Sequence, residues 1–318
     1  MAKKGLKLGL TYFCIIIGAI VLIGGAGIFM FTRYLSTESS ESSLQDQLAD
    51  DDTGYTYVSD EDYVPSFSES RTGLFIYDSG ADRSNGICIA VIRLSADNGE
   101  ILVMPLQSDI YAEVDGTGNT LYEFYRVGGI TQCKKAVEAA LGITVDKYMK
   151  LSESTFNSFA NYMGNVSYTV PYNLVYENTS TGESIIVKKG AQILDSNTLC
   201  KVLTFPEYKN GEEYRAVTVG TLIVSLINLG ADGMLRDNMD TVFTNVINGN
   251  IETDITKYDY DDVSRAMSYI FSNYDSPASP VMPSGTYDRS GYYILDDSFI
   301  AIIDDVLYLN DESASIYD

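Results

Sequence analysis

The apolar run Ile101–Met104 stops at Pro105, and the chain turns polar directly after it. A run of this kind is typical of a buried strand, which needs neighbours on both sides and therefore commits the surrounding chain to a sheet. In α/β folds, sites usually lie where such strands end. We therefore expect any site to lie near Leu106 and Gln107, at a sheet edge that is open to solvent. Neither side chain carries a charge, so neither can hold a phosphate strongly or donate an acidic proton.

The pattern on both sides of this strand predicts one α/β domain. Apolar runs at 73–77 and 87–92 predict two further strands, and Ala96–Gly99 predicts the hairpin turn that leads into the third. Downstream, segments with helical periodicity alternate with short strands. We expect helices at 131–141, 152–163, 195–202, 212–229, 234–248, 261–274 and 299–307, and strands at 144–151, 166–170, 185–187 and 292–295.

The segment 8–31 is apolar and carries no charge. It is longer than the roughly 20 residues that a helix needs to span a bilayer. Lysines precede it at residues 3, 4 and 7, so the positive-inside rule places residues 1–7 in the cytoplasm and the rest of the chain outside. A cleavable signal peptide is the alternative. Because the apolar run continues past the small residues Gly24–Gly27, we favour an uncleaved single-pass anchor in the cell membrane.

The remainder of the chain divides by composition into three parts. Residues 32–70 are rich in Ser, Asp, Glu and Gln and have too little apolar surface to offset their ordering entropy, so we expect an acidic flexible stalk. The folded domain is expected over 71–310. A short acidic tail follows at 311–318.

Composition excludes several classes of function. The formal net charge is −23, and no basic cluster occurs beyond the N-terminus, which argues against nucleic acid as a partner. The chain has no histidine, so Ser-His-Asp and Cys-His catalysis are ruled out. No Cys-x-x-Cys pair is present, so we do not expect zinc. Cys88 and Cys200 lie in apolar runs and are expected to be buried free thiols, but pairing among these two and Cys133 stays open.

Several phrases in the sequence resemble one family, the LytR-CpsA-Psr family of bacterial cell-envelope proteins. The resemblance extends over roughly residues 70 to 310, in addition to the anchor and stalk. Arg83-Ser84-Asn85 is similar to the family's Arg-Ser-Asp, and Val103–Gln107 is similar to its Ser-Ile-Pro-Arg-Asp. Further similar phrases are Leu121–Gly129, Val137–Asp146, Phe156–Val166, Gly190–Leu199 and Glu212–Arg215.

This resemblance implies a mixed central sheet flanked by helices, with an apolar cavity that holds a lipid tail. Enzymes of the family move a glycopolymer from a polyprenyl-pyrophosphate carrier to peptidoglycan or another wall acceptor. Arginines grip the pyrophosphate, and aspartates hold Mg²⁺ beside it, which suits the chemistry of guanidinium and carboxylate groups.

The chain departs from the family at its charged positions. Asn85 stands where the family has an aspartate, and Leu106-Gln107 stands where it has an Arg-Asp pair. The family's Arg-x-Arg phrase falls near Leu203 and Phe205, and Thr218-Val219 replaces its Arg-Gln pair. Each lost charge-assisted contact weakens phosphate binding by about 1.5–3 kcal/mol. The remaining candidates are Arg83, Arg126 and Arg215 for a phosphate, and Asp82 and Asp109 for a metal.

Two functional hypotheses follow. In the first, the protein is a catalytically degenerate member that keeps the scaffold, needs no cofactor, and binds a wall glycopolymer, a polyprenyl-linked precursor or an envelope protein. In the second, it is an active phosphotransferase in which Arg83, Arg126 and Arg215 grip phosphate, and Asp82 or Asp109 holds Mg²⁺. For these residues the simpler roles are surface ion pairs and turn formation. A transcriptional regulator is disfavoured by the acidic charge, and a carboxylate-pair hydrolase has no specific spacing to support it.

Overall fold

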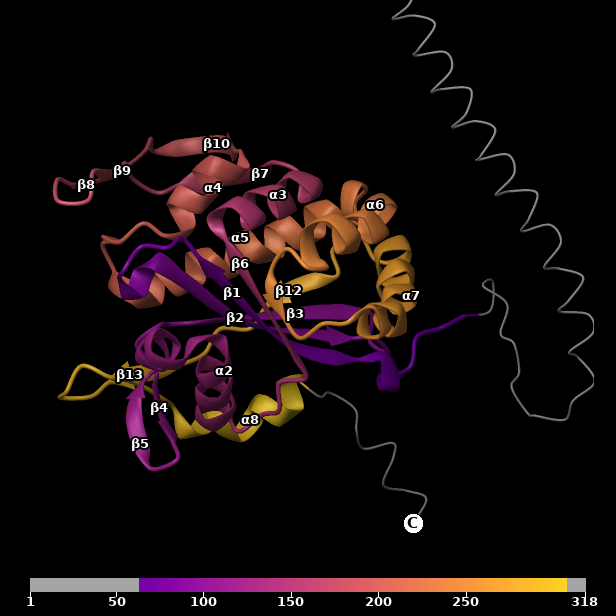
Figure 1. Cartoon of the computed structure of the whole chain (residues 1–318), viewed down its shortest axis with the longest axis horizontal. Coiled ribbons are helices and arrows are strands. Elements are labelled where there is room, and N and C mark those ends of the chain that lie inside the picture. Colours follow the sequence, from indigo (N-terminus) through magenta and orange to yellow (C-terminus); the bar gives the residue numbers. More distant parts are fainter. Residues whose placement is uncertain (1–62, 308–318) are drawn as a thin grey trace, which may run out of the picture. The chain divides into compact units, whose positions relative to one another are not determined.

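A six-stranded mixed sheet forms the centre of the computed structural model, which describes residues 63–307 (Figure 1). β1 pairs in parallel with β6, and β3 pairs in parallel with β12, while the other neighbours are antiparallel. In sheet order the strands are β11 (Glu252–Thr253), β6 (Lys147–Ser152), β1 (Arg71–Asp78), β2 (Ile87–Ser95), β3 (Glu100–Leu106) and β12 (Ala278–Pro280). The mixed sheet and its three predicted central strands are confirmed. The predicted anchor, most of the predicted stalk and the acidic tail lie outside the described residues.

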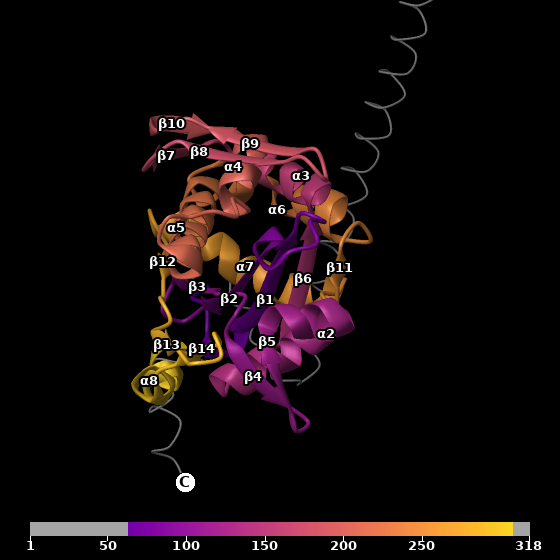
Figure 2. The same cartoon turned by 90° about the vertical axis from the view of Figure 1, so that its left-hand side faces the viewer.

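The sheet is buried on both faces, because alternate side chains of each central strand enter different cores. In β1, Phe75 and Tyr77 pack into one core and Leu74 and Ile76 into the other. Figures 1 and 2 show the larger group of helices on one side of the sheet and two helices on the other. The first group is α3 (Glu153–Met163), α4 (Ser196–Leu203), α5 (Gly211–Ala231), α6 (Met234–Val242), the π-helix η4 (Phe243–Ile247) and α7 (Lys257–Asn273); the second is α2 (Leu121–Leu141) and α8 (Asp297–Leu307).

Both cores draw all their buried residues from the range 74–307. The end of the predicted stalk also packs on this unit, since the ring of Tyr63 meets that of Tyr269 on α7 with centroids 6.0 Å apart, and a short 3-10 turn, η2 (Phe67–Glu69), follows. A protein that starts at Tyr63 therefore contains the whole described core.

Most predicted helix ends are confirmed by the caps that cause them. The hydroxyl of Ser152 accepts a hydrogen bond from the backbone of Thr155 and starts α3, and the carboxylate of Asp195 starts α4 in the same way. Gly142 ends α2 with φ 71°, a conformation that favours glycine. However, α2 begins at Leu121, earlier than predicted. Its first turns are separated from the rest by non-helical dihedral angles at Gly128–Gly129, which interrupt the sequence pattern.

Three antiparallel hairpins were not fully predicted. The longest hairpin covers α4, and each of its two arms contains two strands. Its strands are β7 (Val166–Val170), β8 (Leu174–Asn178), β9 (Glu183–Val187) and β10 (Gly190–Leu194). Two shorter hairpins are β4 (Tyr111–Val114) with β5 (Thr117–Thr120), and β13 (Gly285–Tyr287) with β14 (Tyr293–Leu295).

Among the described residues, α5 alone is long and apolar enough to cross a membrane, but more than half of its most apolar window is buried in the protein, as expected of a core helix. The three described cysteines, Cys88, Cys133 and Cys200, are free and buried. This confirms the prediction for Cys88 and Cys200 and answers the open question about pairing.

Candidate functional site

The end of β3 lies beside the start of β2, but it is not open to solvent. Leu106, Gln107 and Ser108 are only 3%, 4% and 0% exposed, so the predicted open edge is wrong. The β13–β14 hairpin covers this edge. The hydroxyl of Tyr287 donates hydrogen bonds to Gln107 Oε1 at 3.2 Å and to Asp109 Oδ2 at 2.8 Å. Tyr287 lies far along the chain, so no local pattern could reveal this cover.

Arg83 follows β1 and begins the 3-10 turn η3 (Ser84–Gly86) that leads into β2. Its guanidinium forms a bidentate ion pair with Glu183 of β9, with Nη2 at 2.7 Å from Oε1. Nη2 also donates to the Thr204 carbonyl at 3.2 Å, while Nε is buried and has no partner among the described residues. Only 19% of the Arg83 side chain and 29% of the Glu183 side chain are exposed, so the charges of this pair are largely withdrawn from solvent.

Arg215 lies on the first turns of α5 and is 3% exposed. Its Nε and Nη2 bind one oxygen of Glu212 at 2.9 and 2.8 Å, and its Nη1 donates to the Ile87 carbonyl at 3.0 Å and the Leu203 carbonyl at 3.5 Å. Burial acts to lower the pKa of Arg215, but the charge of Glu212 raises it, and the pKa lies above its ordinary value. The guanidinium therefore connects α5, β2 and α4 as a fixed cation.

The structure brings two of the three candidate arginines together. Arg83 and Arg215 donate to the consecutive carbonyls of Thr204 and Leu203 at the C-terminal end of α4, where the helix dipole favours cations. Arg126 does not take part in these contacts. It lies half exposed on α2 and binds Glu123 one turn earlier, at 3.0 Å from Nε and 2.6 Å from Nη2. Each arginine is thus paired with a carboxylate of the protein.

The two candidate metal ligands are held by tyrosines. Tyr122 at the start of α2 donates to Asp82 at 3.4 Å, and Tyr287 donates to Asp109. Burial and, to a smaller degree, the charge of Glu212 raise the pKa of Asp109. The hydrogen bond from Tyr287 lowers it, but the net pKa lies above its ordinary value. Burial thus disfavours the charged form of this carboxyl group, which is the form that binds Mg²⁺.

The donor set around these positions does not fit Mg²⁺ well. Within residues 63–307, no group of three or more Asp, Glu, Cys and His side chains is placed to hold a metal. Asn85 supplies no charge; its amide donates to the Pro206 carbonyl at 3.1 Å, and its Oδ1 is buried without a partner among the described residues. We therefore derive no metal-dependent step from this arrangement.

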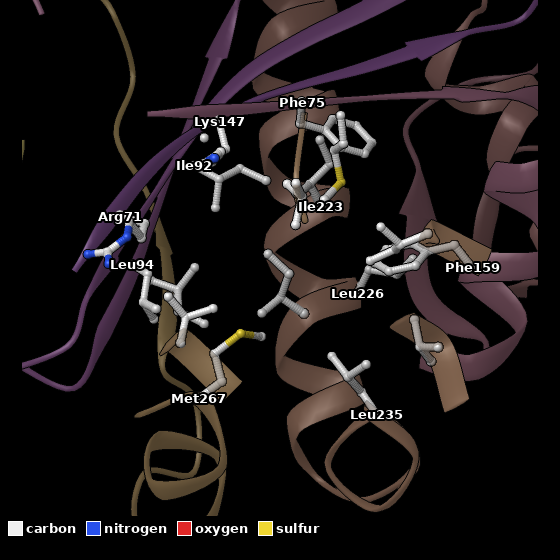
Figure 3. Close-up of a pocket in the computed structure, with 18 of the residues that line it drawn as sticks. Arg71, Phe75, Ile92, Leu94, Lys147, Phe159, Ile223, Leu226, Leu235 and Met267 are labelled. Carbon is white, nitrogen blue, oxygen red and sulfur yellow. The ribbon is translucent and has the colours of Figure 1, made fainter. Parts of the chain in front are cut away.

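An apolar cavity of about 290 Å³ lies between the sheet and helices α3, α4, α5, α6 and α7. This volume is just below the roughly 300–1,000 Å³ typical of ligand pockets. Figure 3 shows Ile92 and Leu94 of the sheet on the left, Ile223, Leu226 and Phe159 of the helices on the right, and Phe75 at the top. The charged side chains in its lining are Arg71, Lys147 and Asp259. Lys147 and Asp259 pair with each other at 2.8 Å.

The cavity and the paired arginines share one residue. Leu203 lines the cavity, while its carbonyl accepts the hydrogen bond from Arg215. Walls of this kind exclude water and suit a hydrocarbon chain, because each CH₂ group that enters gains about 0.8 kcal/mol. The arrangement can therefore bind an apolar chain, and one residue of the cavity wall, Leu203, also contacts the neutralised Arg215.

Sequence reasoning did not identify Glu183 as a site residue. It also gave Glu212 no structural role, although the spacing Glu212–Arg215 was a usable signal, since residues three apart on a helix are neighbours. Glu183 gave no such signal, because it meets Arg83 only through the fold.

Comparisons with known proteins agree with this fold. The model of the LytR_cpsA_psr family matches residues 68–272, which is more than half of the chain. The polyisoprenyl-teichoic acid–peptidoglycan teichoic acid transferase TagU of Bacillus licheniformis is 24% identical over 206 residues, covering 64% of this chain and 65% of its own length. The protein of the same name from Bacillus subtilis is 22% identical over 256 residues, 80% of each chain. The chain thus spans just under two thirds of the Bacillus licheniformis relative.

Solved structures show the same architecture. A protein from Eubacterium siraeum has a TM-score of 0.68 and 25% identity, covering 81% of this chain and 99% of its own. TagT bound to LIIa-WTA has a TM-score of 0.55 and 16% identity, covering 76% of this chain and 91% of its own, a likeness that concerns the fold alone. On the family match and the fold together, this chain belongs to the LytR_cpsA_psr family.

Proposed function

We propose that this protein is a catalytically degenerate member of its family, anchored in the cell membrane with its main domain outside. It binds a polyprenyl-linked wall precursor or the wall glycopolymer that such a lipid carries, and it acts as a scaffold or binding module in the assembly of cell-wall glycopolymers. An envelope protein is a further candidate partner. The names of the two TagU relatives, which specify a polyisoprenyl-linked teichoic acid and peptidoglycan, support this substrate class.

The pairing of the candidate arginines with carboxylates carries the proposal. A diphosphate that approached Arg83 would have to displace Glu183, and the freed carboxylate would then repel the ligand. At about 4 Å, like charges near a protein surface repel by up to about 4 kcal/mol. Arg215 is committed in the same way to Glu212 and to two carbonyls.

The residues that replace the family's charged positions support the same conclusion. Leu106 and Gln107 are buried and uncharged where the family has Arg-Asp, and Asn85 takes the place of an aspartate. Without these groups, little remains to stabilise the negative charge that develops when a phosphate bond breaks. The apolar cavity, in contrast, is retained, which supports binding of the lipid chain.

An active phosphotransferase is the second candidate. It is favoured by the meeting of Arg83 and Arg215 at the end of α4, and by the buried Arg83 Nε and Asn85 Oδ1, which lack partners among the described residues. In this alternative a ligand would supply the missing partners. Mg²⁺ would belong to this alternative only, with Asp82 or Asp109 as its ligand.

Binding and turnover measured on the same protein distinguish the two candidates. Residues 63–318 would first be titrated with a polyprenyl-pyrophosphoryl glycan to measure binding. Mg²⁺ and peptidoglycan, as the acceptor of the glycosyl phosphate, would then be added, and the products would be followed by mass spectrometry. We expect binding without release of polyprenyl phosphate. Ile223→Trp, which fills the cavity, should weaken binding more than tenfold, and Ile223→Phe should do so less.

Val217→Trp on the same helix is the matched control, because Val217 is 41% exposed and does not line the cavity. Thermal melting of each variant checks that the fold is intact. If the Ile223 variants and the control bind the polyprenyl-pyrophosphoryl glycan with the same affinity, the cavity is not the binding site for the lipid chain. Release of polyprenyl phosphate that is lost in Arg83→Ala would establish the active alternative.

A further inference from the structure

The strands β7 to β10 form one bent ribbon rather than two separate hairpins. Val170 lies opposite Gly190 in one half, and Leu174 lies opposite Val187 in the other. Three residues, 171–173, join β7 to β8, whereas only Lys188 and Lys189 join β9 to β10. The extra residue on one strand bends the ribbon as a β-bulge does. Figure 2 shows the four strands running together over α4.

One face of the ribbon enters the core and the other is bare. Val170, Leu174, Ile185, Val187 and Leu194 point inward and are buried. Between them, Val175, Ile186 and Ile193 point outward and are 55%, 60% and 71% exposed.

Two of these exposed side chains are direct neighbours, and Ile193 lies on β10 in the other half of the ribbon. Val175 and Ile186 are directly opposite each other across the two strands. Among the described residues, five aliphatic side chains are more than half exposed, and three of them lie on this face. Single exposed aliphatic residues need no explanation, but a cluster on one face marks an interaction surface.

Basic residues gather at the bend of the same ribbon. Lys188 continues the outward row after Ile186, and Lys189 follows it; both are exposed, and neither forms an ion pair within residues 63–307. The Lys189 amide donates to Asn173 at 2.8 Å, and the ammonium of Lys209 lies 4.4 Å from the centre of the neighbouring Tyr172 ring.

Within residues 63–307, no ion pair joins Lys188, Lys189 or Lys209 to a carboxylate. Glu183 turns inward to Arg83, Glu177 lies near the far tip of the ribbon, and Glu207 precedes Lys209 by two residues. Three lysines therefore gather at one exposed bend of a chain whose net charge is −23.

We propose that this outward face, which we call the ribbon face (Val175, Ile186, Lys188, Lys189 and Ile193), docks on an anionic lipid surface. Aliphatic side chains that enter the boundary between headgroups and acyl chains, together with lysines that meet lipid phosphates, are the two components of interfacial membrane binding. A soluble anionic polymer would use the lysines but would leave three exposed aliphatic side chains without a role. A second copy of the chain would bring a net charge of −23 toward another −23.

The position of the ribbon face gives the docking a consequence. α4 packs beneath β9 and β10, and its Leu199 and Leu203 line the apolar cavity. Docking through the ribbon face would therefore hold the cavity close to the bilayer. The docking itself concerns bulk lipid and does not depend on the proposed function.

Vesicle flotation of residues 63–318 tests the proposal without the N-terminal apolar segment. We expect association with vesicles of phosphatidylcholine and phosphatidylglycerol in equal amounts, little association with phosphatidylcholine alone, and loss of association at high salt. Lys188→Ser/Lys189→Ser should lower the partition coefficient about fivefold for each lysine removed. Ile186→Ser/Ile193→Ser should lower it by a comparable factor.

Val127→Ser/Lys135→Ser is the matched control. Val127 is 78% exposed and Lys135 is exposed, and both lie on α2, on the opposite side of the sheet. All four substituted ribbon positions are exposed, so the variants should melt like the wild type. Vesicle binding that ignores the ribbon variants, or that is absent altogether, would overturn the proposal. Binding of soluble polyphosphate that requires the lysines but not the isoleucines would also overturn it. The same holds for a dimer, detected by sedimentation, that the isoleucine variants abolish.

Discussion

Replacing Arg215 with methionine should destabilise the folded protein strongly. Its guanidinium is buried and supplies donors to Glu212 on α5, to the Ile87 carbonyl of β2 and to the Leu203 carbonyl of α4. Methionine keeps much of the volume but removes every one of these donors. Glu212, whose side chain is 19% exposed, would lose its ion-pair partner.

The size of the effect follows from this burial. Removing one partner of a buried ion pair costs about 3–5 kcal/mol, because the other charge is left uncompensated. At about 3 kcal/mol, the melting temperature of a domain of this size falls by about 6–12 °C. The double variant Arg215→Met/Glu212→Leu should recover much of this loss, since an apolar pair often replaces a buried ion pair at little cost.

Chemical denaturation of residues 63–318 at pH 7 measures this loss, and Arg126→Met is the matched control. Arg126 also pairs with a glutamate three residues earlier, but it lies half exposed on α2. The free energy of unfolding of the control should equal that of the wild type within error. If Arg215→Met also equals the wild type, Arg215 is not a structural brace, and the reasoning that commits it to Glu212 fails.

The remaining predictions concern single groups. Burial raises the folded-state pKa of Asp109, so the folded protein favours the protonated carboxyl group. The contribution of this group to the free energy of unfolding is therefore fully present below about pH 4, and it is lost as the pH rises through the folded-state pKa. Asp109→Asn should therefore stabilise the protein at pH 7 and lose this advantage near pH 4 in denaturation curves. Glu183→Gln frees Arg83 and should strengthen inorganic pyrophosphate binding about tenfold in calorimetry, by one charge-assisted contact. The described thiols should react with a thiol reagent at pH 8 only after unfolding, because burial raises their pKa values to about 11 for Cys88, about 12 for Cys133 and about 11 for Cys200.

The central sheet was predictable because its signal is local. Runs such as Ile87–Ile92 are short and have no polar interruption, which is typical of a strand buried on both faces. Helix ends were predictable where a cap residue marks them, as at Ser152 and Gly142. The start of α2 was missed because the adjacent glycines Gly128 and Gly129 break the helical pattern within a single helical region.

The ribbon strands β8 and β10 were harder to predict, because an exposed face gives them a polar or mixed composition. Gly190–Leu194, for example, alternates only weakly and begins with a glycine. The state of the site was not predictable at all. The ion pair that neutralises Arg83 joins residues 100 positions apart, and the hydroxyl that covers Gln107 comes from a residue 180 positions away. Such contacts depend on the complete fold.

The most direct test of the degenerate site is a turnover measurement. Residues 63–318 would be incubated with a polyprenyl-pyrophosphoryl glycan, Mg²⁺ and peptidoglycan, and the lipid would be quantified by mass spectrometry. We predict that the carrier is recovered with its pyrophosphate and glycan intact. Polyprenyl phosphate that accumulates with the wild type but not with Arg83→Ala would contradict the account.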